Sequence, residues 1–478
     1  MSNTSTLDKR IVLEVIEIEK RHYFKIANSD QMRPFFMSIV SDSDHWMFIS
    51  SNGGVTAGRK NSEYSIFPYY SDDKVTESAE ITGAKAIFQV HKNGQQFVWE
   101  PFSIRDDNNY NTRKNLYKSI YGNSIIFEEE NLDLELSFQY EWASSDTYGF
   151  IKKSKLTNLS SDELEIDLLD GIQNVLPYGV NSALQNASSN LVDAYKRTEL
   201  ELSSGIGIFA LSAIIVDKAE PSEALKANVA WSIGFSNPKY LLSSLQLDTF
   251  RNGKAVQAET DIKAEKGAYF VNEISKFSAN ASKEWMIVTN VNQDRSSIVS
   301  LSKAIGEDPE LTHKIETNIA LGTKKLIALN AASDGLQMSS DHYRDSRHYS
   351  NTLFNIMRGG IFDDGYTIEK WDFENYLKSA NKKVAENNKG LLDSLDKTID
   401  LQTLKALVSD LDDKDFCRLS VEYMPLKFSR RHGDPSRPWN KFSINTRSEV
   451  DGSKILDYEG NWRDIFQNWE ALVHSYPE

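Results

Sequence analysis

The segment Leu132-Asp-Leu-Glu-Leu-Ser-Phe-Gln-Tyr-Glu-Trp142 decides the fold class of the first part of the chain. Apolar and polar side chains alternate along its whole length, which is the period of a β-strand with one face in the core and the other in water. The same period returns in Leu164-Glu-Ile-Asp-Leu168. Because a period of two dominates to about residue 295, the sequence predicts a large antiparallel β-sandwich.

Asn-Gly pairs interrupt this region and predict tight turns between its strands. Asn52-Gly53, Asn93-Gly94 and Asn252-Gly253 each follow a short apolar run. Both central residues of a type I′ turn need a positive φ, which Asn and Gly tolerate best. We therefore expect a hairpin at each of the three pairs.

From about residue 296 the apolar residues recur at helical spacing instead. Asp308-Pro309 is an N-cap followed by proline at the first helical position, and a helix is expected to begin there. Further helices are expected over 339–357, 368–387 and 400–411. The expected domains are a β-sandwich over 1–295, a helical linker over 296–425, and a loop with an opening helix over 426–478.

A last helix is expected over 462–475, with an apolar stripe that consists of Trp462, Ile465, Phe466, Trp469, Leu472 and Val473. Such a stripe gains about 1.5–3 kcal/mol per large side chain only when it is buried. Either this helix docks on the preceding helices, or the chain is the N-terminal part of a longer protein. We favour the second interpretation.

Composition excludes several classes of partner. The 478 residues include 54 Lys and Arg against 69 Asp and Glu, for a net charge of −15. A chain this acidic is a poor candidate for binding nucleic acid or an anionic membrane surface. There is no apolar leader segment and no run near the ~20 residues that span a bilayer. We expect no nucleic-acid or membrane partner and a cytoplasmic location.

The usual catalytic and cofactor motifs are missing from the sequence. It has no phosphate-binding glycine loop, no nucleophile elbow and no His-x-x-x-His pair. Its single cysteine, Cys417, cannot form a thiolate metal site. We therefore predict no metal site and no cofactor, and we assign no catalytic residue.

Aromatic, arginine and carboxylate residues cluster in the last third of the chain. The candidate binding residues in the loop Ser429–Asn440 are Arg431, His432 and Asp434, and a second cluster runs from Tyr458 to Trp469 and includes Trp462. Sugars are bound by this mixture, since aromatic faces cover their C–H groups and polar side chains take their hydroxyls. The alternative is that the Trp residues are core and that the arginines pair with an acidic surface.

The order of a large β-sandwich, a helical connector and a helix that begins Gly460-Asn-Trp-Arg-Asp-Ile-Phe-Gln-Asn468 resembles the cellobiose-phosphorylase group, glycoside hydrolase family 94. In that group an Arg-Asp-x-x-Gln-Asp motif on the first helix of an (α/α)6 barrel helps to hold the sugar. This chain matches the motif at Arg463, Asp464 and Gln467, and it departs at Asn468, where the motif has Asp.

The resemblance implies the N-terminal portion of an enzyme that cleaves or phosphorolyses glycosidic bonds. Arg463, Asp464, Gln467 and Asn468 would bind hydroxyls of an oligosaccharide substrate, with inorganic phosphate as a candidate co-substrate and the catalytic acid outside this chain. A homodimer is compatible with this interpretation. The alternatives are a non-catalytic carbohydrate-binding or scaffold protein, and a polysaccharide lyase in which Tyr366 and Arg430 would act.

Overall fold

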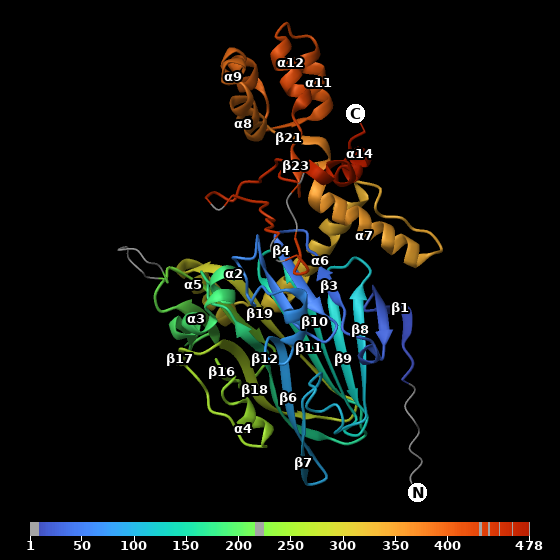
Figure 1. Ribbon diagram of the computed structural model, residues 1–478, viewed down its shortest axis with the longest axis vertical. Coiled ribbons are helices and arrows are strands. Elements are labelled where there is room, and N and C mark those ends of the chain that lie inside the picture. The colour runs from blue at the N-terminus through green and yellow to red at the C-terminus, as the bar shows by residue number, and fades with distance from the viewer. Residues whose placement is uncertain are drawn as a thin grey trace. The chain divides into compact units, whose positions relative to one another are not determined.

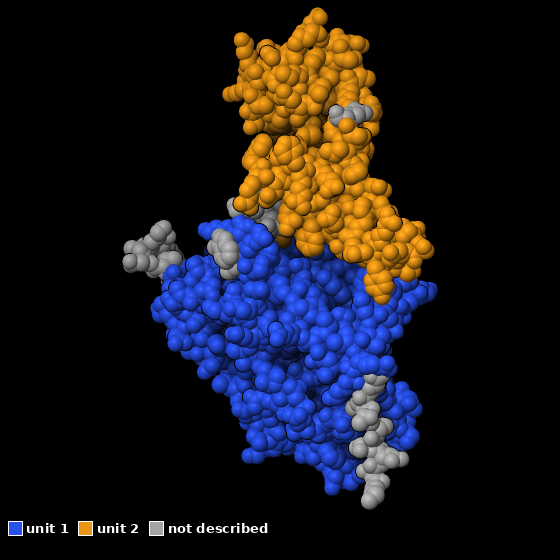
Figure 2. Space-filling model, turned by 45° about the vertical axis from the view of Figure 1, so that its right-hand side comes forward, with its two compact units in different colours: residues 1–325, 433–441 blue, residues 326–432, 442–478 orange. Residues whose placement is uncertain are grey.

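The computed structural model describes two compact units, which are shown in Figures 1 and 2. Unit 1 comprises residues 1–325 and 433–441, and unit 2 comprises residues 326–432 and 442–478. The described residues are 9–215, 224–429, 433–437, 440–448, 450–460 and 462–477.

Unit 1 is built on an 11-stranded sheet in which each hydrogen-bonded strand pair is antiparallel. In spatial order its strands are β1 (Val12–Ile18), β2 (Arg21–Ala27), β8 (Thr112–Ser119), β9 (Ile125–Asn131), β10 (Leu136–Ser145), β11 (Gly149–Asn158), β19 (Ser282–Asp294), β15 (Lys226–Ile233), β14 (Ile206–Leu211), β13 (Lys196–Glu201) and β17 (Asp261–Lys263).

Two smaller antiparallel sheets complete the strands of unit 1. The first is five-stranded, with the order β16 (Lys239–Leu241), β18 (Gly267–Phe277), β12 (Leu164–Val175), β6 (Gly83–Lys92) and β7 (Gln95–Trp99). The second contains β3 (Phe36–Ile39), β4 (His45–Ser50) and β5 (Val55–Arg59).

The large sheet and the smaller ones share one hydrophobic core, so the predicted β-sandwich is confirmed. Phe138 on β10 meets Phe88 on β6 edge-to-face, with ring centroids 5.0 Å apart. Trp142 and Ile166 are completely buried in the same core. The alternating stretch that predicts the strand begins too early, because 132–135 form a turn and the strand starts at Leu136.

Short helices lie at the edges of unit 1, and two longer ones cover part of the large sheet. The short ones are η1 (Ser29–Gln31), α1 (Asp72–Glu77), α2 (Ser182–Ala187), α3 (Ser189–Tyr195) and α4 (Leu247–Arg251). The long ones, α5 (Arg295–Glu307) and α6 (Leu311–Ala331), pack on the outer face of β11, β15 and β19 through Leu311, Ile315 and neighbouring apolar residues.

Two of the three expected hairpins are present. Asn93-Gly94 joins β6 to β7, with φ of 53° and 73° as a type I′ turn requires, and Asn52-Gly53 joins β4 to β5. The third expectation is wrong, because 247–251 form the helix α4 rather than a strand. There Gly253, at φ 72°, closes the helix end, and its amide donates to the carbonyl of Phe250.

The switch from strands to helices falls where the sequence predicts it, since β19 ends at Asp294 and α5 begins at Arg295. Unit 1 nevertheless continues to residue 325, because α5 and the first part of α6 belong to the core of the sheet. The domain division at 295 and 425 remains a prediction.

Unit 2 contains most of the remaining helices and two small sheets. Its elements are α7 (His342–Gly359), β20 (Ile361–Phe362), η2 (Asp363–Tyr366), β21 (Thr367–Glu369), α8 (Lys370–Ala380), α9 (Lys382–Asn387), α10 (Lys389–Ser394), β22 (Thr398–Asp400), α11 (Leu401–Ser409), α12 (Lys414–Glu422), β23 (Leu426–Lys427), η3 (Trp462–Asp464), α13 (Ile465–Asn468) and α14 (Glu470–Ser475).

The segment from β20 to β23 forms a subdomain of unit 2 that has its own hydrophobic core. Buried residues from α8 to α12, among them Phe373, Leu404 and Phe416, form one hydrophobic cluster. The segment starts at β20 and ends at β23, and these two strands pair with each other. The chain therefore enters and leaves this subdomain at the same place, as an inserted segment does.

The helix expected over 462–475 is interrupted. It consists of η3, α13 and α14, and its apolar stripe is only partly buried: Ile465 and Leu472 face the core, while Trp462, Phe466 and Val473 are exposed. α13 and α14 pack against α7. The single continuous helix expected here is therefore wrong, because it is interrupted at Trp469. The contact with α7 buries only part of the apolar stripe.

Candidate functional site

A pocket of about 590 Å³ lies in unit 2, between the inserted subdomain and the segment 454–469. One side comes from α8 and the end of α12 with the residues after it. The other side comes from 454–458, from Trp462 in η3 and from Trp469 directly after α13. Its described lining residues are Asp372, Asn375, Tyr376, Ser379, Glu422, Tyr423, Met424, Leu426, Lys454, Ile455, Leu456, Asp457, Tyr458, Trp462 and Trp469.

Five of these residues are aromatic, and they form two groups. On the subdomain side the rings of Tyr376 and Tyr423 lie 5.2 Å apart. On the other side the ring of Tyr458 meets Trp469 at 5.5 Å and Trp462 at 6.1 Å, both edge-to-face. Trp462 is 75% exposed, so a large part of its face is available to a ligand.

A carboxylate and a phenol are joined in the same wall. The hydroxyl of Tyr423 donates to Oδ2 of Asp372 at 2.6 Å. Burial raises the pKa of Asp372; the Tyr423 hydrogen bond opposes this, and the charges of Glu369, Asp457 and Asp363 raise the pKa further. Burial, followed by the hydrogen bond to Asp372, raises the pKa of Tyr423 as well.

Lys454 fixes the base of the pocket to the start of the subdomain. Its Nζ lies 2.7 Å from Oδ2 of the buried Asp363 and 2.8 Å from Oε1 of Glu369. Burial alone would lower the pKa of Lys454, but the hydrogen bonds and charges of these two carboxylates outweigh it and raise the pKa. Lys454 in turn lowers the pKa of Glu369.

Asp363 stands at the start of a strained turn. Asp364, Gly365 and Tyr366 follow with φ of 48°, 58° and 72°, all in the left-handed region, which is costly for the two residues that have a Cβ. The hydroxyl of Tyr366 donates to the carbonyl of Ser475. Tyr366 is thus engaged in holding α14, which does not favour the role of a catalytic base.

Five of the predicted binding residues lie together on η3 and α13 in unit 2, and one of them lines the pocket. Trp462 lines the pocket. Arg463 extends into solvent with 80% of its side chain exposed, and its Nε lies 3.5 Å from Asp464. Gln467 is exposed as well, whereas Asn468 is buried, with its backbone carbonyl against Gly359 of α7.

Of the predicted residues in the loop Ser429–Asn440, Asp434 is the one that the structure describes. Asp434 belongs to unit 1, where its carboxylate accepts a hydrogen bond from the amide of Ser436 at 2.9 Å and its carbonyl accepts one from the amide of Arg437. Asp434 therefore closes a turn within its own loop. Arg430, Arg431 and His432 lie outside the described residues.

Sequence reasoning missed the subdomain side of the pocket. Asp372 and Tyr376 are four residues apart on α8, so the sequence could have placed them on one helix face. Tyr423 comes from the end of α12, and no local pattern links it to α8. Their meeting depends on how the subdomain packs.

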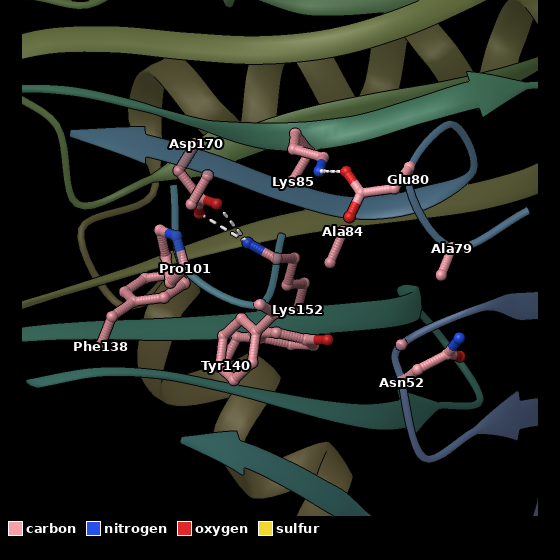
Figure 3. A pocket seen from close by; sticks show the side chains of 13 residues that line it. Asn52, Ala79, Glu80, Ala84, Lys85, Pro101, Phe138, Tyr140, Lys152 and Asp170 are labelled. Carbon is pink, nitrogen blue, oxygen red and sulfur yellow. Dashed lines mark hydrogen bonds and ion pairs between the residues drawn. The ribbon is translucent and has the colours of Figure 1, made fainter. Parts of the chain in front are cut away.

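Unit 1 contains a second, much smaller cavity of about 20 Å³ between its sheets (Figure 3). Completely buried Lys152 reaches both carboxylate oxygens of Asp170 there, at 2.6 and 2.7 Å, and the indole of Trp285 also donates to Asp170. The cavity has room for about one water molecule. It is a polar site within the core rather than a ligand pocket.

Comparison with known families gives one match, over residues 362–425, to glycoside hydrolase family 149 insertion domain 1. These residues are the inserted subdomain, whose ends pair as β20 and β23. The match supports the class of carbohydrate-active enzymes for this chain. The finer resemblance to family 94 stays a prediction.

No curated protein matches the chain. Among solved structures, a bacterial glucoamylase complexed with acarbose is 12% identical, with a TM-score of 0.40, and the alignment covers 78% of this chain and 50% of that one. A candidate kojibiose phosphorylase from the human microbiome is 11% identical, with a TM-score of 0.37, and the alignment covers 86% and 53%. The chain thus spans about half the length of each.

A polysaccharide lyase is similar at 9% identity and a TM-score of 0.31, with 57% of this chain and 34% of that chain covered. Within the described ranges, no helix has the length and apolar character needed to cross a membrane. The same residues contain no group of three or more His, Cys, Asp or Glu side chains arranged to hold a metal ion.

Proposed function

We propose that this chain is part of an enzyme that cleaves or phosphorolyses glycosidic bonds, and that the pocket of unit 2 binds its oligosaccharide. The observation that carries the proposal is the aromatic wall of the pocket. Tyr376 and Tyr423 come from the subdomain that matches a glycoside hydrolase family, and Tyr458, Trp462 and Trp469 come from the cluster that the sequence marks as sugar-binding.

The two kinds of side chain in the wall suit the two kinds of surface on a sugar ring. Aromatic faces pack on the apolar C–H face of a pyranose, and Asp372, Asn375 and Ser379 offer acceptors and donors for its hydroxyls. A volume of about 590 Å³ lies in the ordinary range for a ligand site. In this proposal Arg463, Asp464 and Gln467 extend the binding surface beside Trp462, whereas the predicted residue Asn468 is buried and does not. Phosphate is the candidate co-substrate of an (α/α)6 barrel enzyme.

Calorimetry with neutral glucose tetrasaccharides of β-1,4, β-1,3 and α-1,4 linkage tests the binding. We expect at least one of them to bind, and Trp462→Ala to weaken that binding about 10-fold or more. Phe466→Ala is the matched control, because Phe466 is a neighbouring aromatic residue that is 92% exposed and does not line the pocket. Equal affinities of wild type and Trp462→Ala would contradict the proposal.

Product analysis distinguishes the two reactions and the non-catalytic alternative. With inorganic phosphate present, a phosphorylase releases a sugar phosphate, whereas a hydrolase releases only free sugars whether or not phosphate is added. Binding in the pocket without either product would favour a non-catalytic carbohydrate-binding protein.

A further inference from the structure

The described lining of the pocket in unit 2 has two parts of different chemistry, which we call the rim and the floor. The exposed lining residues are polar or aromatic and form the rim: Asn375, Ser379, Glu422, Asp457 and Trp462. The aliphatic lining residues are buried or half-buried and form the floor: Met424, Leu426, Ile455 and Leu456. Polar groups and aliphatic groups of the described lining are therefore separated.

Two segments that are distant in the sequence meet in the floor. The amide of Leu426, at the start of β23, donates to the carbonyl of Leu456 at 3.0 Å. Residues 424–426 and 455–456 therefore lie side by side, and their aliphatic side chains line the same pocket. The floor is one apolar surface rather than separate apolar contacts.

The polar groups next to the floor are engaged within the protein. The hydroxyl of Tyr423 donates to Asp372 at 2.6 Å. The Nζ of Lys454 lies within 2.8 Å of two carboxylates, those of Asp363 and Glu369. A sugar hydroxyl on the floor would exchange its hydrogen bonds to water for contact with aliphatic carbon, which is unfavourable. An apolar group in the same place gains free energy because it leaves water.

The rim offers the contacts that a sugar needs. Trp462 exposes most of its ring, and an aromatic face packs on the C–H face of a pyranose. Asn375 and Ser379 are four residues apart on α8 and share one helix face, and their amide and hydroxyl groups can both donate and accept hydrogen bonds. A ligand with an apolar end and a sugar end matches both parts of the pocket.

We infer that this pocket takes a glycoside with an apolar aglycone, whose non-sugar group lies on the floor and whose sugar lies at the rim against Trp462. The inference rests on the proposed sugar-binding function of the same pocket and adds the class of ligand. Met424 is the floor residue best suited to a test, because its side chain is only half-buried and its replacement leaves Leu426 and Leu456 in place.

Calorimetry with wild-type protein compares phenyl glucoside with methyl glucoside, each as the α and the β anomer. For at least one anomer we expect the phenyl glucoside to bind at least about 10-fold more tightly, because its ring moves apolar surface out of water. Phenol alone should bind more weakly than that phenyl glucoside, since it lacks the contacts of the sugar with the rim. Met424→Gln, which keeps the length of the side chain and adds an amide, should reduce the ratio of the phenyl and methyl affinities several-fold.

Met338→Gln is the matched control, because Met338 belongs to unit 2, is 92% exposed and is not among the described lining residues. It should leave the ratio unchanged. If the two glucosides bind equally, or Met424→Gln leaves their ratio unchanged, the floor does not receive an aglycone, although a sugar site that binds the tetrasaccharides still stands. If phenol binds as tightly as its glucoside, the pocket takes an apolar group without a sugar, and the inference is overturned. If neither the glucosides nor the tetrasaccharides bind wild-type protein, the proposed function itself fails.

Discussion

Arg463 is the predicted binding residue whose surroundings are easiest to test. With 80% of its side chain exposed, it contributes little to packing, and its guanidinium can offer a planar set of donors to two hydroxyls. We expect Arg463→Ala to weaken oligosaccharide binding about 10-fold while the melting temperature stays within about 2 °C. Arg463→Lys should restore only part of the affinity. A large fall in melting temperature with unchanged binding would make Arg463 a structural residue.

Asp372 should make the free energy of unfolding of the protein depend on pH. The pKa of Asp372 in the folded state lies above the ordinary value of 3.8. At pH values between these two pKa values, the folded state therefore binds more protons than the unfolded chain. Stability from this group is therefore greatest below pH 3.8 and falls as the pH rises through the folded-state pKa.

The measurement is the urea midpoint of Asp372→Asn, which keeps an acceptor for the Tyr423 hydroxyl and removes the charge. The variant should be more stable than wild type at neutral pH, and the difference should vanish at about pH 3. Asp396→Asn, at an exposed position of the same subdomain, should show no such trend. A difference that is independent of pH would rule out the proposed proton linkage.

At the scale of elements, the contact between α7 and α13 depends on a glycine. A Cβ at Gly359 would lie 2.0 Å from the backbone carbonyl oxygen of Asn468, and backbone cannot yield as a flexible side chain can. We expect Gly359→Ala to destabilise the protein by about 1–3 kcal/mol in chemical denaturation.

Gly390 in α10 provides the comparison, since no atom lies within 4 Å of the place its Cβ would take. Gly390→Ala should stabilise the protein by up to about 1 kcal/mol through helix propensity alone. Equal effects of the two substitutions would show that the approach of α13 to α7 is not close in solution.

The elements also show how far the sequence predicts this fold. The apolar period of two was enough to predict the strand β10, and the Asn-Gly pair was enough to predict the hairpin at Asn93-Gly94, because both signals are local. They failed at 247–251, where Leu247 and Phe250 share a buried helix face and the Asn-Gly pair ends a helix instead of turning a hairpin. They also left open which residues of the stripe over 462–473 are buried within this chain, since burial depends on neighbours in space, and Phe466 is exposed.

The candidate site, like the fold, could be predicted only in part from the sequence. The Tyr458–Trp469 cluster stands out in the sequence because its aromatic residues are close together, and the structure places Tyr458, Trp462 and Trp469 in the pocket wall. Asp434 looked similar by composition but closes a turn in unit 1. Composition alone cannot show whether a loop carboxylate faces a ligand or its own backbone.

At the scale of the whole molecule, the structure separates a β-sandwich unit from a helical unit that contains the inserted subdomain. The sequence interpretation assigned all of 296–425 to one helical linker. The separate core of 362–425 and the pairing of β20 with β23 distinguish a subdomain within that region, after the helices α5, α6 and α7. About half of the residues that line the pocket therefore belong to a subdomain that has its own hydrophobic core.

This topology predicts that residues 361–427 fold by themselves. Their buried cluster, which includes Phe373, Leu377 and Phe416, is almost entirely internal to the segment, and its two ends pair with each other as β20 and β23. Produced alone, the segment should give a helical circular dichroism spectrum and a cooperative thermal transition, with a stability of no more than about 3–5 kcal/mol because a domain of this size has a small core.

Phe373→Ala removes a completely buried ring and should cost about 3–5 kcal/mol, which is enough to abolish that transition. Val421→Ala, at an exposed position on α12, should leave the transition in place. A segment without a transition, or one that is insensitive to Phe373→Ala, would mean that the subdomain depends on the rest of unit 2 for its fold.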